Sequence, residues 1–136
     1  MVSSTRRVFQ PIAPDVERVG KAVLDAAYLV HTVPGPGLLE SVYRIAMKHV
    51  IEVNGMLAQT EVKLPITFRD VQLESGLRLD LLVNNCVIAE LKSVEKMNPV
   101  YEAQLLTYLR LSKVRLGYLI NFNVPHLKDG IKRMVV

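Results

Sequence analysis

The chain contains, at residues 78–92, the stretch Arg78-Leu-Asp-Leu-Leu-Val-Asn-Asn-Cys-Val-Ile-Ala-Glu-Leu-Lys92. Asp80, Glu90 and Lys92 are charged, whereas most of the other side chains are apolar and typical of buried strands. An unpaired buried charge is costly, so such groups usually have a partner, a metal ion or a catalytic role. Side chains two positions apart along a strand point the same way, so Glu90 and Lys92 share one face.

These three charged side chains define a candidate metal site. Carboxylate oxygens are ligands that Mg²⁺ prefers, and an adjacent lysine adds a cation, a combination that suits hydrolysis of phosphodiester bonds. The alternative is an exposed ion pair between Glu90 and Lys92, with Asp80 as a surface acid, because most charge pairs are solvated. The apolar neighbours of Glu90 leave little room for an exposed face and favour an enclosed pair. These neighbours are Val87, Ile88, Ala89 and Leu91.

Convergence of the two acids depends on the length of the hairpin loop at Asn84-Asn85. With a two-residue loop, Asp80 lies opposite Ala89 and faces away from Glu90, because opposed residues share a face. A loop with an odd number of residues, or a bulge, brings the acids together. Asn84 or Asn85 can adopt the left-handed conformation that a three-residue loop needs. A single site therefore requires an odd loop or a bulge.

Apolar residues recur at helical spacing in three other segments. The first helix is expected to open at Pro14-Asp15 and to end before Pro34-Gly-Pro-Gly37, because prolines remove backbone donors and glycines permit turn angles. The second runs from about Leu38 to Val53. The third begins at Asn98-Pro99, with Asn98 as N-cap, and continues to about Ser112.

The remaining segments predict strands. Apolar residues alternate with polar ones over Val62–Phe68, which predicts one half-buried strand, at a sheet edge because of Pro65. The hairpin strands are Leu77–Val83 and Cys86–Lys92. The apolar run Leu116–Phe122 predicts a strand covered on both faces, joined to the hairpin by a right-handed parallel crossover. The tail Ile131–Val136 is expected to add one short strand.

Length and composition predict a single domain at residues 14–136, after a loose arm at residues 1–13. Half of the 136 residues are hydrophobic, which argues against a disordered chain. The net charge of +4 is compatible with a polyanionic partner. One cysteine excludes an internal disulfide. Without a secretion signal or a transmembrane run, the sequence predicts a soluble cytoplasmic protein with no membrane association.

Two further groups of residues lie at helical spacing. Glu40 and Tyr43 are three apart near the start of the second helix, although a glutamate there is favoured by the helix dipole in any case. Gln104 and Tyr108 lie one turn apart on the third helix, with Tyr101 on the same stripe, where they could meet the Glu90 face. Taken alone, each group would be read as ordinary helix surface.

Together these motifs resemble the GxxExxY family of the PD-(D/E)XK nuclease-like superfamily. The motifs occur in the expected order and on the expected elements: Gly37-x-x-Glu40-x-x-Tyr43, Asp80, Glu90-x-Lys92, Glu102-Ala-Gln104-Leu-Leu-Thr-Tyr108 and Ile120-Asn-Phe-Asn-Val-Pro125. The resemblance covers nearly everything from Asp15 onward. It implies an α/β fold with a restriction-endonuclease-like core, in which helices flank a central mixed β-sheet. Leu79 stands where the superfamily motif has proline.

The resemblance also implies a metal-dependent nuclease and a role for each site residue. Asp80 and Glu90, with Glu40 as a further ligand, would hold Mg²⁺ or Mn²⁺. Lys92 would orient the attacking water or offset charge on the phosphate. The expected substrate contacts or supporting residues are Tyr43, Gln104 and Tyr108.

Two other functions remain open on the sequence. A binding or accessory module could keep the nuclease fold without turnover, contacting nucleic acid or a protein partner. The charges could also form a purely structural ion-pair network. A nuclease of this size could in addition act as a homodimer that cuts two strands.

Overall fold

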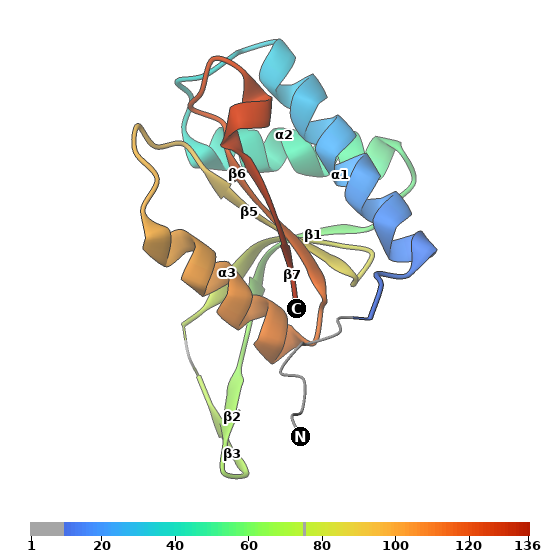
Figure 1. The fold of residues 1–136 in the computed structure, drawn as a ribbon, viewed down its shortest axis with the longest axis vertical. Coiled ribbons are helices and arrows are strands. Elements are labelled where there is room, and N and C mark those ends of the chain that lie inside the picture. The colour runs from blue at the N-terminus through green and yellow to red at the C-terminus, as the bar shows by residue number, and fades with distance from the viewer. Residues whose placement is uncertain (1–9, 75) are drawn as a thin grey trace, which may run out of the picture.

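The computed structural model describes residues 10–74 and 76–136, so residues 1–9 of the predicted arm lie outside the described residues. Its centre is a five-stranded mixed sheet in the order β1-β4-β5-β6-β7 (Figure 1). The strands are β1 (Ala58–Lys63), β4 (Arg78–Val83), β5 (Val87–Lys92), β6 (Leu116–Asn121) and β7 (Ile131–Val135). Among these neighbours β5 and β6 run parallel and the other pairs antiparallel, which confirms the predicted parallel connection.

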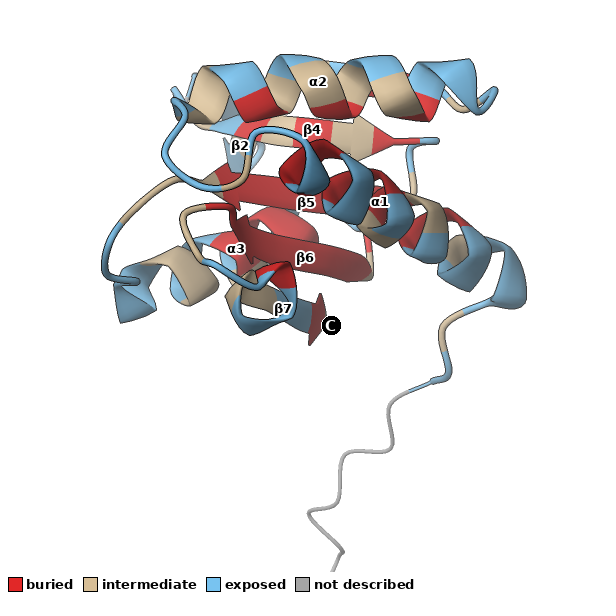
Figure 2. Ribbon diagram, turned by 90° about the horizontal axis from the view of Figure 1, so that it is seen from above, coloured by how far each residue is buried: buried red, intermediate tan, exposed pale blue. Residues whose placement is uncertain are grey.

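Three helices flank the sheet: α1 (Pro14–Thr32), α2 (Glu40–Val53) and α3 (Pro99–Ser112). Residues of α1 and α2 form one hydrophobic core with the sheet, and residues of α3 form a second one. β5 and β6 therefore run between two cores, and nearly all of their residues are buried (Figure 2). Asn98 accepts a hydrogen bond from the Val100 N–H (3.0 Å), as expected of an N-cap. The predicted fold class and helix starts are confirmed.

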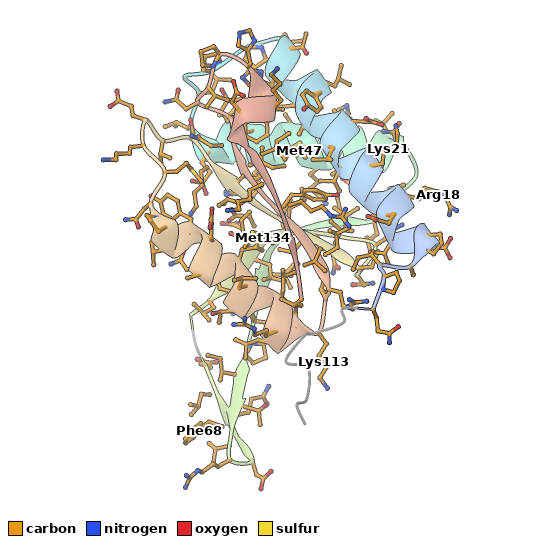
Figure 3. The ribbon with its side chains drawn as sticks, in the orientation of Figure 1. Arg18, Lys21, Met47, Phe68, Lys113 and Met134 are labelled. Carbon is orange, nitrogen blue, oxygen red and sulfur yellow. The ribbon has the colours of Figure 1, made fainter. Side chains whose placement is uncertain are left out.

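The predicted single strand over Val62–Phe68 is wrong. β1 begins earlier, at Ala58, and ends at Lys63, on the predicted sheet edge. A separate hairpin of β2 (Ile66–Phe68) and β3 (Val71–Leu73) follows. The chain leaves the main sheet at Leu64-Pro65, because Pro65 has no N–H to continue a ladder. Figure 3 shows this hairpin projecting from the body, with Phe68 near its tip.

The ends of the described chain are tied to the sheet. The Arg115 guanidinium, just before β6, donates to the carbonyls of Gln10 (2.6 Å) and Pro11 (3.2 Å). A short 3₁₀ helix, η1 (Leu127–Gly130), connects β6 to β7. None of the helices in the described part of the chain is both long and apolar enough to cross a membrane.

Candidate active site at the fork between β4 and β5

The hairpin between β4 and β5 turns through three residues, from Asn84 to Cys86. Val83 pairs with Val87 and Leu81 with Ala89, so the next opposed positions are Asp80 and Glu90. Asn84 and Asn85 adopt positive φ angles of 48° and 55°, and the Cys86 N–H closes the turn on the Val83 carbonyl (3.0 Å). The odd loop required for a single site is confirmed. Cys86 belongs to this loop rather than to the strand predicted to begin there.

The ladder between β4 and β5 stops at Leu81 and Ala89, although both strands continue. Beyond this point the two acids take over the hydrogen bonding. The Asp80 N–H donates to Glu90 Oε1 (3.1 Å), and the Leu91 N–H donates to Asp80 Oδ2 (2.9 Å). The strands therefore form a fork, and the two carboxylates fill the opening between its arms.

Glu90 is enclosed at this fork, with 6% of its surface exposed. Burial, followed by the negative charge of Asp80, raises the pKa of the Glu90 carboxyl to about 9, and the Lys92 ammonium opposes this shift. The alternative of a solvated surface pair is therefore wrong for Glu90. A cation placed between the two acids would favour the charged form of Glu90 that burial disfavours.

Lys92 ends β5 on the same face as Glu90 and is half-buried. Its Nζ lies 4.5 Å from the centre of the Tyr101 ring, a cation–π contact with the first turn of α3. Within the part of the chain that the structure describes, it forms no ion pair with Asp80 or Glu90. Tyr101, which sequence reasoning placed on the stripe without giving it a role, therefore holds the lysine.

Glu40 approaches the fork from the first residue of α2. Burial, followed by the negative charge of Asp80, raises the pKa of its carboxyl, while Lys92 and Arg44 lower it. The Ser93 hydroxyl donates to the Leu38 carbonyl (2.6 Å), which joins the loop after β5 to the loop before α2. The start of α2 thus brings a third acid into the electrostatic field of the pair.

Tyr43 supports this arrangement from the core. Its ring is fully buried and stacks on Phe122, with centroids 4.4 Å apart. Its hydroxyl donates to the Gly35 carbonyl (2.6 Å) and accepts from the Leu38 N–H (3.2 Å). This position fits the supporting role of the two predicted ones, because the side chain offers no exposed atom to a substrate.

The two remaining predicted residues differ in their surroundings. Tyr108 is buried, and burial together with the charges of Glu90 and Asp80 raises the pKa of its hydroxyl. It therefore lies on the α3 side of the acids. Gln104 is exposed and makes no side-chain hydrogen bond within the described residues, so its role as a substrate contact or supporting residue stays a prediction.

The donor chemistry at the fork suits Mg²⁺ or Mn²⁺. Mg²⁺ is usually held by one or two carboxylates and keeps several waters, a set that Asp80 and Glu90 can supply. The two acids are opposed, and burial makes the charge on Glu90 costly without a counter-cation. Among residues 10–74 and 76–136, no three His, Cys, Asp or Glu side chains form a preset metal cluster. Glu40 is therefore not preset as a third ligand.

Comparison with known proteins places these features in a family. A sequence model of the PD-(D/E)XK nuclease superfamily matches residues 17–134, which includes the fork, α2, α3 and all of α1 except its first turn. No curated protein and no solved structure matches the chain. The match spans well over half of the sequence and agrees with the mixed sheet flanked by helices. The chain belongs to the PD-(D/E)XK nuclease superfamily.

Proposed function

We propose that this protein is a metal-dependent nuclease that hydrolyses phosphodiester bonds in nucleic acid, and that it is a GxxExxY member of its superfamily. The observation that carries the proposal is the opposed pair Asp80–Glu90, enclosed at the fork with Lys92 on the same face as Glu90. Hydrogen bonding of the strands alone does not explain two acids here, because burial makes the charge on Glu90 costly without a counter-cation, which a metal ion would supply.

In this mechanism Asp80 and Glu90 would hold one Mg²⁺ or Mn²⁺ ion. When bound, the ion would polarise the phosphate and increase the acidity of the attacking water. Glu90 would release to solvent the proton that burial favours, because only its charged form binds the ion well. The two acids fix the position of the scissile phosphate relative to the end of β5.

The other residues of the fork act on charge and on water. Lys92, held against the Tyr101 ring, offsets the negative charge that builds up on the phosphate oxygens. Glu40, close to Asp80 and Lys92, orients the attacking water by accepting its hydrogen bond. Tyr108 bounds the site on the α3 side, and Tyr43 fixes the loop that carries Glu40.

A cleavage assay tests this function. Purified protein is incubated with single- and double-stranded DNA and RNA, with Mg²⁺, Mn²⁺ or EDTA, beside an Asp80→Asn control. We expect cleavage of at least one substrate with either ion, and none with EDTA or in the variant. Tight binding of a nucleic acid without any cleavage would support the accessory module instead. Cleavage that persists in Asp80→Asn would identify a contaminating nuclease.

A further inference from the structure

A polar cavity lies away from the fork. It has a volume of about 480 Å³ and opens between the end of α1 and the loop from β6 to η1. Its walls include Tyr28, His31, Thr32, Gly35, His126 and Lys128. Nothing in the mechanism proposed above uses this cavity.

The chemistry of the cavity is that of an anion site. Lys128 is cationic, His126 can donate through a ring nitrogen, and Tyr28 adds a hydroxyl group. The Thr32 hydroxyl already donates to the Tyr28 carbonyl (2.7 Å). No acidic residue is among the described residues that line it. Asp129 follows Lys128 in the chain but does not line the cavity. A phosphate would therefore meet donors and positive charge here without a carboxylate to repel it.

His31 is fixed in this wall by a hydrogen bond from one ring nitrogen, and its other ring nitrogen is free within the described chain. Its Nε2 lies 2.8 Å from the Val124 carbonyl, and a carbonyl only accepts, so Nε2 carries the hydrogen. Nδ1 has no protein partner in the described structure. Every fully buried side-chain N or O atom in the described chain does have a partner, so Nδ1 is reachable by solvent.

The cavity lies at the same edge of the sheet as the fork. β5 and β6 are parallel, Lys92 pairs with Asn121, and their carboxyl ends therefore point the same way. The Asn121 side chain donates to the Val94 carbonyl (3.0 Å) and accepts from the Val94 N–H (3.1 Å). Figure 1 shows the loops after β5 and β6 and the start of α2 gathered at this end of the molecule. A strand of nucleic acid at the fork would thus extend along a rim that includes the cavity.

We propose that the cavity binds a backbone phosphate of the nucleic acid, away from the bond that is cut. This inference rests on the proposed nuclease function. Lys128 supplies the charge, His126 donates to the phosphate oxygens, and the site fixes the direction in which the strand leaves the fork. Phosphate contacts of this kind position a strand without reading its sequence.

The test measures binding without cleavage. Full-length Asp80→Asn protein in EDTA is titrated with a fluorescein-labelled single-stranded DNA, and the anisotropy is recorded over a range of salt concentrations. Lys128→Met and His126→Gln are added to this background. Lys113→Met is the matched control, because Lys113 is an exposed lysine at the opposite end of the molecule (Figure 3). Inorganic phosphate is titrated separately while the His31 ring resonances are followed by NMR.

We expect Lys128→Met to weaken DNA binding severalfold and to lower the salt slope by about 0.7, as the loss of one phosphate contact to a single strand does. His126→Gln should weaken binding, Lys113→Met should not, and phosphate should shift the His31 ring resonances, because His31 lines the cavity. Equal effects of Lys128→Met and Lys113→Met, or a His31 ring that ignores phosphate, would overturn the proposal. Absence of cleavage by the wild-type protein, with these binding results intact, would refute only the nuclease function.

Discussion

Asp80 and Glu90 each accept a backbone hydrogen bond from the opposite strand at the fork: the Asp80 N–H donates to the Glu90 carboxyl group, and the Leu91 N–H donates to the Asp80 carboxyl group. Each acid thus satisfies a backbone donor that the interrupted ladder leaves free. A buried N–H without an acceptor would be costly, so the acids also hold the strands apart in a defined geometry. The same two side chains therefore fix the geometry of the strands and form the candidate metal site.

Metal binding should stabilise the fold through these acids. We expect Mg²⁺ or Mn²⁺ to raise the melting temperature, because an ion that binds only the native state adds to its stability. Asp80→Asn should reduce that rise, whereas Asp25→Asn, at an exposed acid paired with Lys21 on α1, should leave it unchanged. Thermal unfolding with and without the ion measures both. An equal rise in wild type and Asp80→Asn would place the ion elsewhere.

The stability of the metal-free protein should fall as pH rises. The pKa of Glu90 is raised from 4.5 to about 9, so between these values the native state binds more protons than the unfolded state. Stability then decreases with pH across that window. Glu90→Gln keeps an oxygen for the Asp80 N–H without a titrating group, and it should flatten the dependence. Urea unfolding in EDTA at a series of pH values measures this, and an unchanged slope in the variant would assign the dependence to another group.

The sequence predicted the participants of the site better than their arrangement. Asn84 and Asn85 both tolerate positive φ, so local sequence allowed loops of two or three residues, and only the paired strands fix the choice. Apolar and polar residues alternate through Pro65, so the sequence predicted one strand. The structure has two strands, because the chain leaves the main sheet at Pro65. The role of Tyr43 depends on stacking against Phe122 from a distant strand, which helical spacing cannot disclose.

Tyr43→Phe should distinguish the support that the Tyr43 hydroxyl gives to the loop before Glu40 from the packing of the Tyr43 ring. The change keeps the ring on Phe122 but removes the hydroxyl that bonds Gly35 and Leu38. Loss of these bonds should cost about 1–3 kcal/mol of unfolding free energy. Cleavage should fall because Glu40 begins the helix that this loop precedes. Urea unfolding and single-turnover cleavage measure the two effects, and full stability would show that water replaces the hydroxyl.

Lys92→Met should separate catalysis from folding. Methionine keeps much of the apolar stem of lysine but removes the ammonium, so cleavage should fall by orders of magnitude while metal-induced stabilisation persists. Tyr101→Leu should reduce cleavage less than Lys92→Met does, because it removes the ring beneath the ammonium and not the charge. Tyr101→Phe should have little effect, because it keeps that ring. Single-turnover cleavage beside thermal unfolding, with and without Mg²⁺, distinguishes these cases. Undiminished cleavage by Lys92→Met would leave this lysine without a role in the transition state. Equal losses of cleavage in the two Tyr101 variants would mean that the Tyr101 hydroxyl, and not its ring, supports cleavage.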